Sequence, residues 1–166
     1  MRFLARWRVF LGFVFAAVAL WLATPTVTSL LIGSVVSITG ELIRLWAAGH
    51  LEKSKEVTRS GPYRFTRHPL YLGSSLIGIG FAIAASHAVV AVMVIAYLLL
   101  TLTAAMRSEE AHLREKFGDA YDAYVEKRSE PMPRRFSWQR ALYNREHHTM
   151  AGLAGALAIL TTKLYW

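Results

Sequence analysis

The chain has 166 residues, 54% of them hydrophobic, and a formal net charge of +8. This length suits a single domain over residues 1–166, and the lack of cysteine excludes a disulfide scaffold, a thiolate metal site and a catalytic thiol. In a soluble protein so positive a charge would indicate nucleic acid as partner, but here the hydrophobic residues come in blocks.

The first apolar block, residues 9–23, carries no charge and follows three arginines. Trp7 and Trp21 at its ends suit anchors at a membrane interface. A cleaved signal peptide is the alternative, but the further apolar blocks favour a membrane span.

The second block, residues 27–49, is long enough to cross a bilayer, and its second half carries Glu41 and Arg44. These two residues share a helical face, so they are expected to pair. The pair either extends to the membrane interface or forms the polar wall of a site that opens into the membrane.

Two further apolar blocks, residues 70–85 and 88–106, are separated only by Ser86 and His87. So short a connection predicts a tight helical hairpin. Glycines and serines in the first arm would let neighbouring helices approach closely.

From Arg107 the chain becomes charged, with apolar residues at helical spacing. This pattern predicts a juxtamembrane amphipathic helix, with Gly118 as a bend or cap and with Tyr121 and Tyr124 packing at the interface.

Ser137 is expected to cap one last helix, which runs through Asn144-Arg145-Glu146 into the final apolar block. That polar triplet either contacts a substrate headgroup or anchors the helix. His147 and His148 are adjacent and point to different faces of a helix, so no metal site is expected.

Five spans would place every Lys and Arg except Lys163 on one side of the membrane, because the turns at residues 24–26 and 86–87 carry no charge. By the positive-inside rule the N-terminus is then cytoplasmic and the C-terminus lies outside. The sequence therefore predicts an all-α, polytopic membrane helical bundle with about five transmembrane helices, of the type found in bacterial inner membranes. The basic excess is a topology signal that anionic lipids can reinforce, and no nucleic-acid partner is expected.

The densest group of aromatic, basic and backbone-fixing residues is the run GPYRFTRHPLYLG, residues 61–73. Its first two residues predict a turn. Pro69 keeps His68 extended and suits the first turn of the following helix. Arg67 and His68 are therefore expected at a helix N-terminus, where backbone N–H groups attract anions.

This run, followed after one hairpin by EEAHLREKFGDAYDAY, resembles the isoprenylcysteine carboxyl methyltransferase family, and GELIRLWAAGHL upstream fits its bacterial members. Related membrane methyltransferases act on phospholipid amines. The resemblance covers roughly residues 40–130, the expected catalytic core, and implies an integral membrane methyltransferase with a cytoplasmic loop that binds S-adenosylmethionine.

The resemblance also implies the site. Carried over by position, the residues that would contact the cofactor are Tyr63, His68, Pro69, Leu70, Tyr71 and Glu109, with Val57 in a stretch that aligns by offset. Arg107 lies nearest to the family's substrate-side arginine.

The chemistry of the cofactor agrees with these residues. Arg67 and the adjoining helix start suit its carboxylate. Glu109 or Glu110 suits its ammonium or ribose hydroxyls, and Tyr63 and Tyr71 offer aromatic faces to a cation or to adenine.

The leading hypothesis is methyl transfer to a lipophilic acceptor that enters sideways from the surrounding lipids. A carboxylate acceptor needs no general base and would be oriented by an arginine such as Arg107. An amine must first lose a proton, so Glu110 or His112 becomes the candidate base. Two rivals stay open: a membrane reductase that uses NADPH through a similar loop, and a small non-catalytic membrane protein for binding or assembly.

Overall fold

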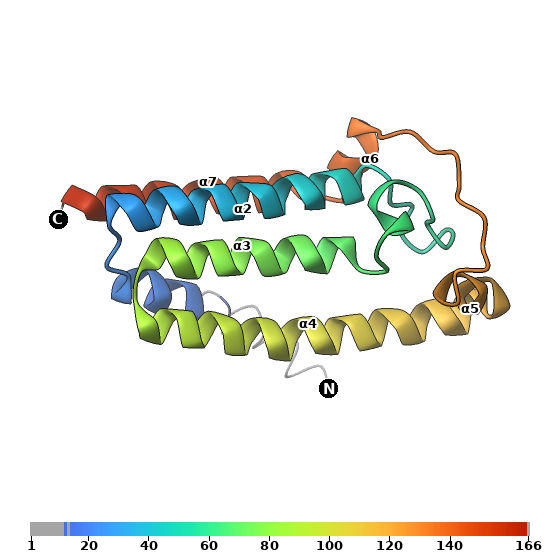
Figure 1. The fold of residues 1–166 in the computed structure, drawn as a ribbon, viewed down its shortest axis with the longest axis horizontal. Coiled ribbons are helices and arrows are strands. Elements are labelled where there is room, and N and C mark those ends of the chain that lie inside the picture. Colours follow the sequence, from blue (N-terminus) through green and yellow to red (C-terminus); the bar gives the residue numbers. More distant parts are fainter. Residues whose placement is uncertain (1–11, 13, 166) are drawn as a thin grey trace.

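The computed structural model describes residue 12 and residues 14–165, and within them the protein is helical and contains no strand (Figure 1). Trp7, the arginines before the first apolar block and the first residues of that block lie outside the described residues. Residues 14–22 of the block are helical. Trp21 lies in the last turn of this helix and is 80% exposed, as an interfacial anchor requires. The all-α prediction is confirmed for the described part of the chain.

Four long helices lie with their axes roughly aligned, the chain running one way in two of them and the opposite way in the other two, and the short elements gather mainly at one end (Figure 1). The long helices are α2 (Val27–Ala48), α3 (Pro69–Ala85), α4 (Ala88–Phe117) and α7 (Glu146–Thr162). The short elements are η1 (Gly61–Arg64), α5 (Asp119–Val125), α6 (Trp138–Tyr143) and, at the opposite end, η2 (Lys163–Tyr165).

Among the described helices, α2 and α4 are long and apolar enough to cross a membrane, and α3 is equally apolar but has only 17 residues. The prediction of about five membrane spans is thus not confirmed by the length and hydropathy of the described helices. Large apolar side chains on α4 point away from the protein: Val92, Leu99 and Leu100 are 68%, 62% and 73% exposed. Such a surface suits lipid rather than water.

The closest packing in the fold joins α2 to α3, and glycines make it possible. Gly33 and Gly40 of α2 lie against Gly80 and Gly73 of α3. A Cβ atom added to Gly40 would lie 2.6 Å from the carbonyl oxygen of Gly73. The small faces expected in this part of the chain therefore set the helix spacing.

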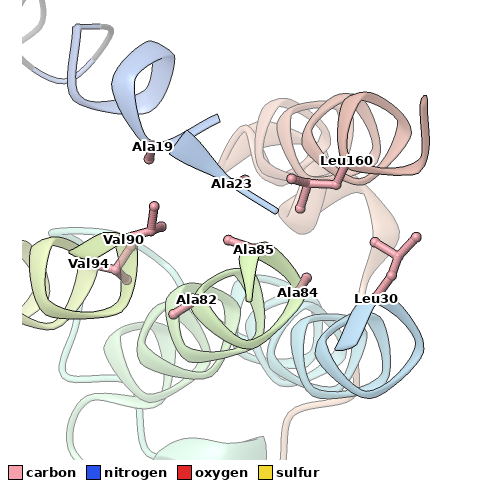
Figure 2. Close-up of a cluster of buried hydrophobic side chains, with 9 residues drawn as sticks. All are labelled: Ala19, Ala23, Leu30, Ala82, Ala84, Ala85, Val90, Val94 and Leu160. Carbon is pink, nitrogen blue, oxygen red and sulfur yellow. The ribbon is translucent and has the colours of Figure 1, made fainter. Parts of the chain in front are cut away.

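The predicted hairpin is confirmed, because α3 ends at Ala85 and α4 begins at Ala88. Ser86 adopts the left-handed conformation (φ 50°) that turns the chain. The backbone N–H of Thr24 donates to the carbonyl of Ala85 at 2.8 Å, so the two uncharged turns lie together. Beside them small buried side chains form a core (Figure 2): Ala19, Ala23, Leu30, Ala82, Ala84, Ala85, Val90, Val94 and Leu160.

Lys163, the one basic residue expected on this side, has a local function. Its ammonium donates to the carbonyls of Leu20 (2.9 Å) and Trp21 (2.8 Å) at the end of the first helix. A cation at a helix C-terminus offsets the helix dipole there.

The amphipathic helix predicted from Arg107 is divided in the structure: its part beyond Gly118, with Tyr121 and Tyr124, is the short helix α5, and the part before Gly118 is not a separate element. Its residues continue α4, whose 30 residues reach about 45 Å and exceed a bilayer core of about 30 Å, so its second half extends past the apolar layer. The predicted bend is confirmed: Gly118 has φ 48°, and its N–H donates to the carbonyl of Arg114 at 2.9 Å.

The last helix differs from the prediction. Ser137 caps α6 as expected, but the helix stops before Asn144 and α7 begins anew after Arg145, which has φ 62°. The Asn144 amide donates to the carbonyls of Ala48 (2.9 Å) and Leu51 (3.0 Å). These bonds to the end of α2 and the residues after it fix the break, so Asn144 anchors the chain here.

Gly80→Ala tests the helix contact. A methyl group here would lie 2.5 Å from the carbonyl oxygen of Gly33. We expect the free energy of unfolding to fall by about 1–3 kcal/mol, measured by thermal unfolding in detergent. Gly152→Ala on α7 is the control, because a Cβ atom there meets nothing within 4 Å, and it should be neutral or stabilising by up to about 1 kcal/mol. Equal losses in both variants would contradict the role given to Gly80.

Candidate active site

A pocket of about 860 Å³ opens at the end of the bundle where the loops and short helices gather. It brings together residues from the loop after α2, from η1, and from α3, α4 and α5. Six of the residues predicted to contact a cofactor line it: Val57, Tyr63, Arg67, Leu70, Tyr71 and Glu109. The α3–α4 hairpin explains this, because it returns Glu109 to the level of Tyr71.

Tyr63 is the most buried aromatic residue of the central motif in this pocket, with 8% of its surface exposed. The hydroxyl of Tyr124 donates to its carbonyl at 2.8 Å and thus connects η1 to α5. Burial, and next the charge of Glu109, raise the pKa of the Tyr63 hydroxyl far above its usual range. The hydroxyl therefore stays protonated and can act as a donor.

A second, smaller pocket of about 330 Å³ lies between α3 and α4. Its lining is mostly apolar and includes Leu72, Leu98 and Leu102. His68 lines this groove rather than the larger pocket, while Tyr71 lines both. Pro69 lines neither, since it is buried at the first position of α3.

Glu110 and Arg107, the predicted catalytic residues, both lie outside the lining of the larger pocket. An oxygen of Glu110 lies 2.8 Å from His68 Nε2 and 3.2 Å from Arg67 Nη1. Glu110 therefore orients two residues of the central motif. Arg107 is exposed and lines neither pocket, whereas His112 lines the larger one.

The expected pairing of Glu41 with Arg44 is wrong. Arg44 pairs with Glu146 of α7, with its Nε 2.6 Å from the carboxylate, and also donates to Thr149 (3.2 Å) and Ser74 (2.5 Å). The side chains of Glu146 and Arg44 are 3% and 18% exposed, so the pair is largely shielded from solvent. Glu41 is buried, with only 7% of its surface exposed, yet within the described residues neither of its carboxylate oxygens has a hydrogen-bond partner.

The sequence left open whether Arg44, Asn144 and Glu146 belong to a site, and all three line the pocket. Sequence reasoning missed Tyr121 and Tyr124, which also line it but were expected only to pack at the interface. Tyr121 is 1% exposed. The repeated aspartate-alanine-tyrosine pattern after Gly118 was the available signal, because it places both rings on one turn of α5.

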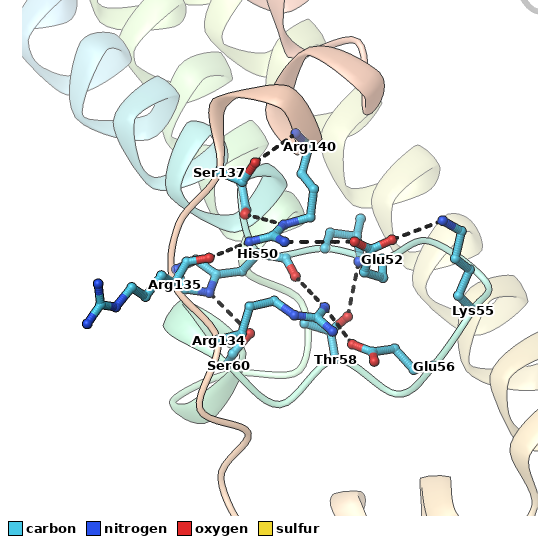
Figure 3. Close-up of polar contacts among 12 residues, drawn as sticks. His50, Glu52, Lys55, Glu56, Thr58, Ser60, Arg134, Arg135, Ser137 and Arg140 are labelled. Atoms are coloured by element: carbon cyan, nitrogen blue, oxygen red, sulfur yellow. Dashed lines mark hydrogen bonds and ion pairs between the residues drawn. The ribbon is translucent and has the colours of Figure 1, made fainter.

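His50 lies in the loop after α2 and belongs to a polar cluster there (Figure 3). It is 5% exposed, and its Nδ1 lies 3.1 Å from Ser60 Oγ. Burial, followed by the charges of Arg140 and Arg134, lowers the pKa of its imidazole. The residue is therefore neutral in the folded protein near neutral pH.

Comparison with known proteins shows to which family the chain is related. Residues 7–120 match the family model described as phospholipid methyltransferase. The nickel-cobalt-cadmium resistance protein NccN of Alcaligenes xylosoxydans xylosoxydans is 30% identical over 118 residues, which cover 69% of this chain and 53% of that protein. The cobalt-zinc-cadmium resistance protein CzcN of Cupriavidus metallidurans is 32% identical over 123 residues, covering 67% and 55%.

The chain thus spans about half the length of the curated relatives it matches. No solved structure matches it. In the part of the chain that the structure describes, no group of three or more His, Cys, Asp or Glu side chains is arranged to hold a metal ion.

Glu41→Met and Glu146→Met should change stability in opposite directions. The first removes a buried carboxylate without a partner and is expected to raise the free energy of unfolding by about 1–3 kcal/mol. The second leaves Arg44 uncompensated and should lower it by about 3–5 kcal/mol. Thermal unfolding in detergent measures both, and a destabilised Glu41→Met variant would show that the carboxylate has a stabilising contact.

Acid should destabilise the protein through His50. Because its pKa is lowered in the folded state, the unfolded chain takes up a proton first as the pH falls through about 6.5. The stability contribution is thus present above that pH and is lost below it. The melting temperature should fall less between about pH 7.5 and about pH 5.5 in His50→Gln than in the wild type. Parallel curves for the two proteins would refute this.

Proposed function

Because the chain belongs to the phospholipid methyltransferase family, we propose that it is an integral membrane enzyme that transfers a methyl group from S-adenosylmethionine to a lipophilic acceptor. One observation carries the proposal: Tyr63, Leu70 and Tyr71 of the central motif share a pocket with Glu109 from beyond the hairpin. A pocket that carries charged side chains, beside a groove lined mostly by apolar ones, is what a charged donor and a lipid acceptor require.

The residues of the larger pocket fit this cofactor. Its volume of about 860 Å³ suits a ligand of nucleotide size. Glu109 is available to an ammonium group or to ribose hydroxyls, and Arg67 to a carboxylate. Four tyrosines in the lining offer faces to a cation or to adenine.

Tyr71 lines both pockets, so the two reactants would meet beside it. When bound, S-adenosylmethionine supplies an activated methyl group. The protein would align the acceptor with this group and exclude water from it. Leu98 and Leu102 of the groove would hold the apolar chain of the acceptor.

The two acceptor classes would use different residues. An amine must lose its proton, and His68, held by Glu110 at 2.8 Å on the groove side, is well placed to accept it, as is His112 in the larger pocket. A carboxylate needs a cation to orient it. Arg67 lines the larger pocket and is better placed for this than the exposed Arg107.

The same proposal places the pocket at the cytoplasmic surface of the membrane. Apart from Lys163, the charged residues that the structure describes gather toward the pocket end of the bundle, whereas the turns at residues 24–26 and 86–87 at the other end carry no charge. Positive charge is retained on the cytoplasmic side of membrane proteins.

Calorimetry of the purified protein tests the cofactor. S-Adenosylmethionine and S-adenosylhomocysteine should bind, and NADPH should not. Glu109→Gln is expected to weaken S-adenosyl binding about 10- to 100-fold, because it removes a charged acceptor. Glu115→Gln, an exposed change of the same charge on α4, is the control. Unchanged binding in Glu109→Gln, or binding of NADPH alone, would reject the proposal.

Lipid extraction after incubation of membranes with methyl-labelled cofactor separates an enzyme from a binding protein. Label should appear in an extracted lipid with the wild type and disappear with Glu109→Gln. Cofactor binding without any labelled product would instead favour a non-catalytic membrane protein.

A further inference from the structure

One wall of the larger pocket is a loop with almost no regular structure. This wall loop, residues 49–60, connects α2 to η1 and places Val57, Glu56 and Thr58 in the lining. A loop of this kind keeps one shape only where other parts of the protein hold it.

A second segment supplies those contacts. We call residues 126–137, between α5 and α6, the strap. The N–H of Met132 in the strap donates to the carbonyl of Arg59 at 3.4 Å, and that of Ser137 to the carbonyl of Gly49 at 3.1 Å. The strap is thus bonded to both ends of the wall loop.

Arg134 joins the middle of the strap to the pocket lining. One of its nitrogens, Nη1, lies 2.6 Å from the carboxylate of Glu56 and donates to the carbonyl of His50 at 3.2 Å (Figure 3). The side chains of Arg134 and Glu56 are 19% and 28% exposed, so this ion pair is shielded more than a surface pair. Arg140 of α6 adds a bond of 2.8 Å to the carbonyl of Gly49.

We propose that Arg134 is a positioning residue, which holds the wall loop in the shape that binds the cofactor by fixing Glu56 and the His50 carbonyl. This inference rests on the proposed function, since the ligand is the cofactor of the same pocket. The strap lies beyond residues 7–120, so the part of the chain that matches the family does not build this wall alone.

Limited proteolysis of the ligand-free protein tests whether Arg134 holds the wall loop in place. Trypsin cleavage after Lys53 and Lys55, followed by mass spectrometry, reports on the wall loop. Arg134→Ala should raise the rate of these cleavages about tenfold, because contacting residues couple by amounts of this size. Arg135→Ala, an exposed neighbour in the strap, should leave it unchanged. Equal rates in Arg134→Ala and the wild type would overturn the proposal.

A double-mutant cycle on cofactor affinity tests the functional part. Arg134→Ala and Glu56→Gln should each raise the Kd for S-adenosylmethionine about tenfold, and the double variant should be no worse than the weaker-binding single variant. Effects that multiply in the double variant would show that the two residues act independently and would refute the proposal. If Arg134→Ala does not fold, as judged by circular dichroism, Arg134→Lys replaces it in the cycle and in the proteolysis, with a smaller rise expected in both.

Failure of the proposed function and failure of the positioning role of Arg134 give different results. If the wild type does not bind S-adenosylmethionine, the proposed function is refuted. Faster cleavage of ligand-free Arg134→Ala would even then show that Arg134 stabilises the wall loop. If the wild type binds and Arg134→Ala binds equally well, only the positioning role is refuted.

Discussion

The guanidinium of Arg44, whose side chain is 18% exposed beside the pocket, is the constraint on which the site depends. A charge in that position needs a close counter-charge, and Glu146 supplies it at 2.6 Å from another helix. The same side chain reaches Ser74 and lies over Gly73, where any larger residue would collide with it. One cation therefore fixes the relative positions of α2, α3 and α7 at the level of the pocket.

The site divides into a polar and an apolar part because of where the helices end. α4 continues beyond the length that a bilayer core accommodates, so its last turns carry Glu109 and Glu110 among polar loops. Its preceding turns face α3 across a groove lined by leucines. Tyr71, near the start of α3, borders both, which makes this boundary the natural place for a charged donor and a lipid acceptor to meet.

Local signals in the sequence determined much of this arrangement. Two residues between apolar blocks left room only for a hairpin, and the hairpin brings Glu109 back to Tyr71. Pro69 set the start of α3, and Gly118 set the end of α4, because each restricts or frees its own backbone. Such features need no knowledge of distant neighbours.

The partners of charged and polar side chains were decided only by the tertiary structure. Spacing along a helix allowed Glu41 to pair with Arg44. The packing of α7 instead brought Glu146 to Arg44, and among the described residues Glu41 has no hydrogen-bond partner. The break before α7 depends on bonds from Asn144 to the end of α2, almost a hundred residues earlier. A sequence shows which groups need partners, but which of them meet depends on how distant helices pack.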